Sequence, residues 1–305
     1  MRIDFESKLI EHLRSENEQV HYVSLIYSIL NRCNVEDPHF DVHKKIINSI
    51  ELLKASTLII DDIIDNTDIR DGQDSFLKQF GINNGIIAGE LLKSHSTIAF
   101  IESINALPLP ENVKIRCILV FEDSYRTVLK GQYDDINSLY FRPEMKKWDK
   151  ATWSIYFRKY LSIIYNTTSV FLQIPYLIIK TMQADQNKWE NAYDEYFRFL
   201  GLAYQLRDDI IDSVSTQGES GKCLGGDIVE KKIRLPMILF FRDTEMTDLK
   251  IEVFELLNLS SDGIALQAKR LIDILYQSNS VKQSIEFLNS GSATESVGEN
   301  RTMVA

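Results

Sequence analysis

Apolar residues recur along most of this chain at the three- and four-residue spacing of an α-helix. One such stripe contains Ile46, Ile47, Ile50 and Leu53 and leads into an expected helix that runs to about Asp65. The segments between turn-forming residues follow this spacing rather than the strict alternation of a half-buried β-strand. The pattern therefore predicts a chain that is nearly all helix.

Prolines, glycines and polar turn residues divide the expected helices. The clearest breaks are Asn-Asn-Gly at 83–85, Pro-Leu-Pro at 108–110, Arg-Pro at 142–143 and the stretch 213–226. Further helices are expected at about 85–104, 111–136, 150–165, 168–182, 189–212 and 235–242, with two more before residue 289. No linker divides the chain into halves, so we expect one all-α domain over residues 1–289. Residues 290–305 carry few large apolar groups and are expected to form a flexible tail.

Composition and charge narrow the possible functions. The chain has 305 residues, 44% of them hydrophobic, and a formal net charge of -10, so it can bury a sizeable core but would repel nucleic-acid phosphates. Its three cysteines, Cys33, Cys117 and Cys223, lie far apart without metal-ligand spacing, which fits a reducing compartment. The N-terminus is charged, and no apolar run approaches the roughly 18 residues of a membrane span. We therefore expect a cytoplasmic protein that does not span a membrane and has no nucleic-acid partner.

An acidic segment, Asp-Asp-Ile-Ile-Asp, occurs on two expected helices: once as Asp61, Asp62 and Asp65, and again as Asp208, Asp209 and Asp212. The first and fifth residues of each segment lie one turn apart on the same helix face. Like charges at this spacing cost roughly 0.2–0.5 kcal/mol, and apolar surroundings raise that cost, so a cation is required. Carboxylates without neighbouring His or Cys suit Mg²⁺, which keeps some waters and bridges to phosphate. The alternative is an acidic helix face that is simply exposed to water. That alternative could explain one such segment, but it is a poorer explanation for two.

Further motifs accompany the acidic segments in a fixed order. They are DDIIDNTDIRDG at 61–72, FGINNGIIAGELL at 80–92, GQxxD at 131–135, GxxxQxxDDxxD at 201–212, GK at 221–222 and GDxxxxKxxLP at 226–236. This ordered set resembles the trans-isoprenyl diphosphate synthase (polyprenyl synthetase) family over about residues 45–240. The resemblance implies an isoprenoid synthase-type bundle of antiparallel helices around a central cavity, with the two acidic helices facing each other at its mouth.

The resemblance also implies roles for individual residues. All six aspartates would hold Mg²⁺, as three ions together with bound diphosphate, and the catalytic residues would be Asp61, Asp62, Asp65, Asp208 and Lys222. The diphosphate of an allylic prenyl substrate would contact Arg70, Gln132, Thr167, Gln205, Lys222 and Lys232. Ser56 and Thr57 are small residues at the places that limit the prenyl chain, so a C15 or longer chain would fit unless the region of Phe100 or Phe121 closes the cavity. A homodimer is implied as well.

The chain departs from the family at the site of the second substrate. Family members that condense isopentenyl diphosphate carry a GGKRxRP-type element near the N-terminus, whereas residues 21–40 offer only Arg32 and two histidines. Asp71 and Asn166 also replace residues that are usually an arginine and a lysine. A diphosphate carries about two to three negative charges, and its transfer to a site without cations is strongly unfavourable. We therefore expect an enzyme that ionises an allylic diphosphate and delivers the prenyl cation to itself, to water or to an acceptor other than isopentenyl diphosphate.

Two alternatives stay open on sequence grounds. The first is an ordinary chain-elongating polyprenyl diphosphate synthase with an unusual second-substrate site. The second is a non-catalytic partner subunit of a heteromeric prenyl synthase, which the retained motif residues oppose.

Overall fold

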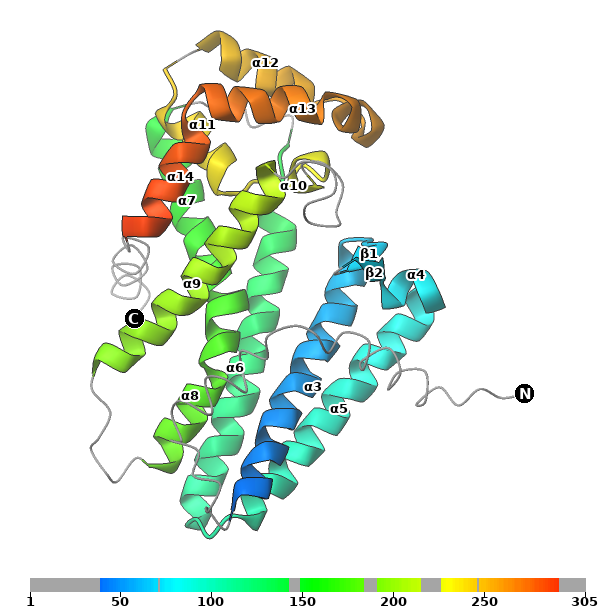
Figure 1. Cartoon of the computed structure of the whole chain (residues 1–305), viewed down its shortest axis with the longest axis vertical. Helices are drawn as coiled ribbons and strands as arrows, with labels where there is room; N and C mark the ends of the chain where they lie inside the picture. Colours follow the sequence, from blue (N-terminus) through cyan, green and yellow to red (C-terminus); the bar gives the residue numbers. More distant parts are fainter. Residues whose placement is uncertain are drawn as a thin grey trace. The chain divides into compact units, whose positions relative to one another are not determined.

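The computed structural model describes residues 39–70, 72–142, 149–183, 191–214, 226–245 and 247–290 (Figure 1). These residues form two compact units. Unit 1 contains the described residues up to Asp123 and those from Ile174 to 183, and unit 2 contains the remainder. The expectation of one domain over residues 1–289 stays a prediction. The expected tail, from residue 291 onward, lies outside the described residues.

Unit 1 consists of helices and one short hairpin: α3 (Phe40–Ile64), β1 (Ile69–Arg70), β2 (Gln73–Asp74), α4 (Phe76–Phe80), α5 (Ile82–Ala106), the first part of α6 (Glu111–Ser138) and the second part of α8 (Val170–Met182). Helices α3 and α5, blue and cyan in Figure 1, lie side by side. Gly89 permits this close approach, because a Cβ atom there would lie 2.7 Å from Cδ1 of Ile60. Ile59, Phe76 and Leu92 form part of the core between these elements.

Unit 2 contains the second part of α6, followed by α7 (Lys150–Ile164), the π-helix η1 (Tyr165–Ser169), the start of α8, α9 (Asn191–Val214), α10 (Gly226–Val229), α11 (Leu235–Asp243), α12 (Thr247–Leu257), α13 (Ser261–Gln277) and α14 (Ser280–Ser290). Asp149 is the N-terminal cap of α7. Its side chain accepts a hydrogen bond at 2.8 Å from the backbone N–H of Thr152, which has no acceptor within the first turn of the helix. Helix α7 packs on α11 through Trp153, whose ring stacks on that of Phe241 at 4.5 Å.

The prediction of an all-α bundle is confirmed, since strand pairing in the described residues is confined to the β1–β2 hairpin and one isolated bridge. The hairpin itself was missed by the sequence prediction. Its strands are two residues long and too short to show alternation. It forms where Asn66 (φ +51°) and Gly72 (φ +79°) turn the chain back on itself.

Two expected helix boundaries and one expected number of helices were wrong. The break expected at Asn-Asn-Gly lies instead at Gly81, whose φ of +79° ends α4 before α5 begins at Ile82. The helices expected at 150–165 and 168–182 are continuous through η1, because a π-turn absorbs the irregularity without ending the helix. Two helices were expected after residue 242, but the described residues of this region form three, α12, α13 and α14.

The continuous helix Lys150–Met182 is, among the described residues, long and apolar enough to cross a membrane by length and composition. About two thirds of its most apolar window, 67%, is buried within the protein, as is usual for a core helix.

Candidate active site

The first acidic segment lies at the end of α3, where Asp65 is the C-terminal cap. The hairpin that follows brings Arg70 back over this helix end. Its Nε donates a hydrogen bond to Oδ1 of Asp62 at 2.7 Å, and its Nη2 lies 3.4 Å from Oδ2 of Asp61. The side chain of Asp62 is 5% exposed, whereas that of Asp61 is 34% exposed. The segment therefore has one aspartate held in the interior by an arginine and a neighbour that is open to solvent.

Local backbone contacts fix this arrangement. The backbone N–H of Thr67 donates to the carbonyl of Asp62 at 2.9 Å, and the hydroxyl of Ser75 donates to the carbonyl of Thr67 at 2.6 Å. Strand β1 pairs with β2 in antiparallel register, with Arg70 opposite Gln73. The chain between the acidic segment and α4 is thus closed onto the end of α3, which holds the guanidinium beside the carboxylates.

The second acidic segment, in unit 2, shows the same difference in burial between its first and second aspartates. The side chain of Asp208 is 35% exposed, whereas Asp209 is 4% exposed. The carboxylate of Asp209 accepts hydrogen bonds from the hydroxyl of Tyr160 at 2.7 Å and from the amide of Gln205 at 2.7 Å. Asp212, one turn after Asp208, is half-buried. In both segments the first aspartate is accessible and the second is buried among fixed donors.

A buried arginine compensates the charge around Asp209. Arg234 binds Asp135 through two hydrogen bonds, of 2.7 Å and 3.1 Å, and its Nε lies 3.7 Å from Oδ2 of Asp227. Burial raises the pKa of Asp209 to about 7, while the positive charge of Arg234 opposes that rise and Asp227 adds to it. Burial together with the carboxylate of Asp209 raises the pKa of Tyr160 well above its usual range, so its hydroxyl stays a donor.

This charge network was missed by the sequence prediction. Asp135 and Asp227 were part of quoted motifs, but Arg234 was given no role. The three residues are brought together from α6, α10 and the N-terminal cap of α11. Arg234 and Asp135 are 99 positions apart in the sequence, and periodicity carries no information about such a pair.

The π-helix η1 connects the expected ligand Thr167 to the second acidic segment. Thr168 donates from its hydroxyl to the amide oxygen of Gln205, and the hydroxyl of Thr167 donates to the carbonyl of Ile163 at 3.0 Å. Two glycines allow neighbouring helices to approach this turn: a Cβ atom on Gly131 would lie 2.8 Å from Cβ of Asn166, and one on Gly201 would lie 2.3 Å from Cα of Ser169.

The other residues expected to contact the diphosphate differ in their exposure to solvent, and one of them lies outside the described residues. Lys232 is 7% exposed, and its ammonium lies 2.8 Å from Oε2 of Glu230. Gln132 is half-buried on α6. Lys222 lies outside the described residues, so its expected role stays a prediction.

The residues expected to limit the prenyl chain lie in unit 1. Ser56 is 1% exposed at the α3–α5 contact, and Thr57 is half-buried and donates to the carbonyl of Lys54 at 2.8 Å. Phe100 and Phe121 are fully buried and stack with their ring centroids 4.2 Å apart.

The carboxylates of the acidic segments can be compared with the ligands that a metal ion requires. Among the described residues no three His, Cys, Asp or Glu side chains are grouped so as to hold an ion. Mg²⁺ does not need such a group, because it is usually bound by one or two carboxylates, several waters and substrate phosphates. An accessible Asp61 with Asp65 one turn later, and Asp208 with Asp212, fit this requirement.

The architecture is that of known prenyl synthases. The fold matches the crystal structure of polyprenyl synthase from Caulobacter crescentus CB15 complexed with calcium and isoprenyl diphosphate, with a TM-score of 0.70, 17% identity, and coverage of 96% of this chain and 82% of that chain. The family model described as polyprenyl synthetase matches residues 20–261. The chain therefore belongs to the polyprenyl synthetase family.

Curated relatives share part of their length with this chain. One is a short chain isoprenyl diphosphate synthase of Methanocaldococcus jannaschii, 28% identical over 79% of this chain and 64% of the relative. Another is a geranylgeranyl diphosphate synthase of Methanosarcina mazei, 28% identical over 68% of this chain and 58% of the relative. The chain thus spans somewhat under two thirds of their length. Their names favour ordinary chain elongation over the expected transfer to a different acceptor.

Proposed function

We propose that this protein is a chain-elongating prenyl diphosphate synthase. It ionises an allylic prenyl diphosphate by breaking the carbon–oxygen bond to the diphosphate, and the allylic carbon then forms a carbon–carbon bond with isopentenyl diphosphate. The proton lost from the adduct goes to the released diphosphate. The observation that carries the proposal is the repeated acidic segment with an accessible first aspartate and a buried, donor-bound second one, within a chain of the polyprenyl synthetase family.

The residues that would hold Mg²⁺ are the accessible pairs, Asp61 with Asp65 and Asp208 with Asp212; up to three ions would bind together with diphosphate. Bound Mg²⁺ would neutralise the negative charge that develops on the leaving diphosphate. In this assignment Asp62 and Asp209 position the pairs and do not bind the metal directly, because both are buried. Oδ1 of Asp62 accepts from Arg70, and the two oxygens of Asp209 accept from Tyr160 and Gln205.

The protein's own cations and polar groups would orient the diphosphate. Lys222 and Lys232 would add charge-assisted hydrogen bonds, and Arg70 would contribute from the hairpin. Gln132, Gln205 and Thr167 would complete the polar lining. Ser56 and Thr57 would bound the prenyl chain, with the stacked pair of Phe100 and Phe121 as the alternative boundary.

A homodimer and a cytoplasmic location complete the proposal. Within unit 1, α5 and the first part of α6 expose large apolar side chains: Ile87 and Leu119 are each 61% exposed, Ile115 is 56% exposed and Ile98 is 53% exposed. A second copy that covers these residues would remove their apolar surface from water. Light scattering on the purified chain gives the oligomeric mass, and a monomer would oppose this part of the proposal.

The second candidate is transfer of the prenyl cation to an acceptor other than isopentenyl diphosphate. The absence of a GGKRxRP-type element from residues 21–40 favours it. That stretch lies outside the described residues except for its last two positions.

One experiment separates the two candidates. Purified protein with Mg²⁺ is incubated with geranyl, farnesyl or geranylgeranyl diphosphate, each with and without isopentenyl diphosphate, and the products are identified by mass. Chain elongation gives longer diphosphates only when isopentenyl diphosphate is present. A hydrocarbon or alcohol formed without isopentenyl diphosphate supports the second candidate, and no consumption of any allylic diphosphate would contradict both.

A further inference from the structure

A hollow of about 340 Å³ lies in unit 2, where the end of α6 and the chain after it approach the first turns of α7. Its lining includes Ser138, Tyr140 and Arg142 from one side and Thr152, Tyr156 and Lys159 from the other. The acidic segments and the diphosphate contacts proposed above contribute none of these residues. The hollow therefore needs an explanation of its own.

The hollow is basic in a chain that is acidic overall. Among the residues that the structure describes, the charged members of its lining are Arg142 and Lys159, and none of the described lining residues is a carboxylate. The full chain carries a formal net charge of -10, so a cavity with two cations stands out from the rest of the sequence. Asp149, at the start of α7, lies outside this lining and accepts a hydrogen bond from the Thr152 hydroxyl at 2.8 Å.

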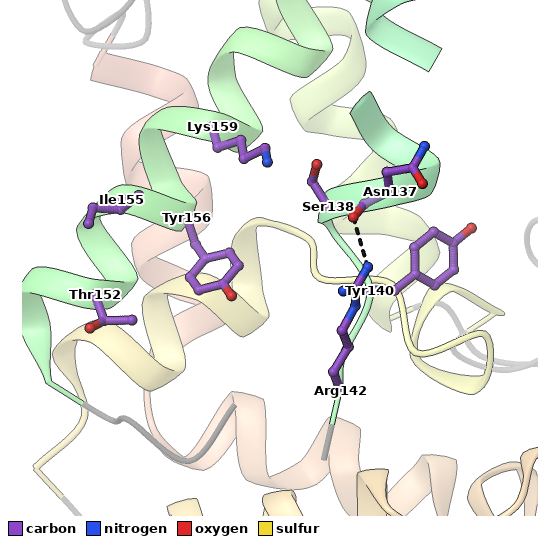
Figure 2. Close-up of a pocket in the computed structure, with 8 residues that line it drawn as sticks. All are labelled: Asn137, Ser138, Tyr140, Arg142, Thr152, Ile155, Tyr156 and Lys159. Atoms are coloured by element: carbon purple, nitrogen blue, oxygen red, sulfur yellow. Dashed lines mark hydrogen bonds between the residues drawn. The ribbon is translucent and has the colours of Figure 1, made fainter. Parts of the chain in front are cut away.

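The two cations differ in how they are held. Nη2 of Arg142 donates to the backbone carbonyl of Asn137 at 2.9 Å, which fixes the guanidinium against the end of α6. The ammonium of Lys159 forms no ion pair with any of the residues that the structure describes. In Figure 2 the side chains of Lys159 and Ser138 point toward each other, and the Tyr156 ring and the Arg142 guanidinium border the same space. Arg142 is thus held against the end of α6, whereas Lys159 has no ion-pair partner within the described part of the chain.

We propose that this hollow binds a small phosphorylated anion, of the size of inorganic diphosphate, without a metal ion. A guanidinium fork and an ammonium that approach from two elements match a group with several terminal oxygens and at least two negative charges. The hydroxyls of Tyr156 and Ser138 supply further donors at the same space. A carboxylate has one charge and two oxygens and would leave part of this donor set unused.

The proposal does not depend on the proposed function, and its test avoids turnover. Calorimetric titration of the full chain with inorganic diphosphate is carried out in EDTA, so that sites which need Mg²⁺ are silent. We expect one metal-independent site in the wild type and a loss of affinity of about tenfold or more in Lys159→Gln. Arg158→Gln is the matched control, because Arg158 is the exposed neighbour on the same helix and does not line the hollow.

Inorganic phosphate and sulfate serve as further probes. Both should bind more weakly than diphosphate if the donors span two phosphoryl groups. Arg142→Gln gives a second variant, with folding of each variant checked by circular dichroism. Absence of metal-independent binding would overturn the proposal, and so would equal affinity in Lys159→Gln and Arg158→Gln. A chain that elongates prenyl diphosphates normally but fails this titration would leave the proposed function intact and remove the second site.

Discussion

Replacing Arg234 with methionine would remove the guanidinium that now contacts both Asp135 and Asp227. The side chains of Arg234 and Asp135 are 11% and 14% exposed, so water cannot take over the lost hydrogen bonds of 2.7 and 3.1 Å. Breaking a buried ion pair by removing one partner costs about 3–5 kcal/mol, because the remaining charge is left buried and uncompensated. We expect a loss of that size in the free energy of unfolding.

Urea unfolding followed by circular dichroism measures this change. The matched control is Arg158→Met on the exposed face of α7, which should change stability by less than about 0.5 kcal/mol. The double variant Arg234→Met with Asp135→Asn should recover a substantial part of the loss, since it removes one of the stranded charges. A loss below about 1 kcal/mol in Arg234→Met, or no coupling in the double variant, would refute the reasoning that Arg234 stabilises this network.

Three further predictions concern single sites. Gly201→Ala should lower stability by more than about 2 kcal/mol, because its Cβ would lie 2.3 Å from Cα of Ser169. Gly226→Ala should be nearly neutral, because its Cβ would have no atom of the described residues within 4 Å, and thermal unfolding compares the two variants. Burial raises the pKa of Asp209 to about 7, so the folded protein binds a proton at this carboxyl more tightly than the unfolded chain does. The free energy of unfolding should therefore fall as pH rises from about 4 to about 7. In metal-free urea titrations Asp209→Asn should flatten this pH dependence, and an unchanged slope would contradict the assignment to Asp209. Burial raises the pKa of the Cys117 thiol to about 11, so peptide mapping after alkylation at pH 8 should find Cys117 unlabelled in the native protein and labelled after unfolding.

The sequence allowed the helices and the acidic segments to be predicted because both are local signals. Helical spacing needs a dozen neighbouring residues, and Asp61 and Asp208 belong to short motifs that repeat. The helix end at Gly81 was placed wrongly because Asn-Asn-Gly also has turn chemistry, and only the backbone angle at Gly81 decides between them.

The environment of each motif aspartate could not be predicted in this way. All six aspartates were expected to bind metal, but Asp62 and Asp209 differ from Asp61 and Asp208 in burial, which depends on partners elsewhere in the chain. Arg70 reaches Asp62 through a hairpin of two-residue strands. Tyr160 reaches Asp209 from a separate helix, 49 positions away in the sequence. Such contacts arise from tertiary packing and produce no periodic pattern in the amino-acid sequence.

The central claim is that accessible aspartates hold Mg²⁺ against a diphosphate leaving group. The most direct measurement is the rate of diphosphate release from an allylic substrate, with isopentenyl diphosphate present, as Mg²⁺ is titrated into the wild type, Asp61→Ala, Asp208→Ala and the control Asp262→Asn on the exposed start of α13. We expect release that depends on Mg²⁺ in the wild type and the control, and a rate lower by more than about a hundredfold in the other two variants. Release that is indifferent to Mg²⁺, or equal in all four proteins, would contradict the claim.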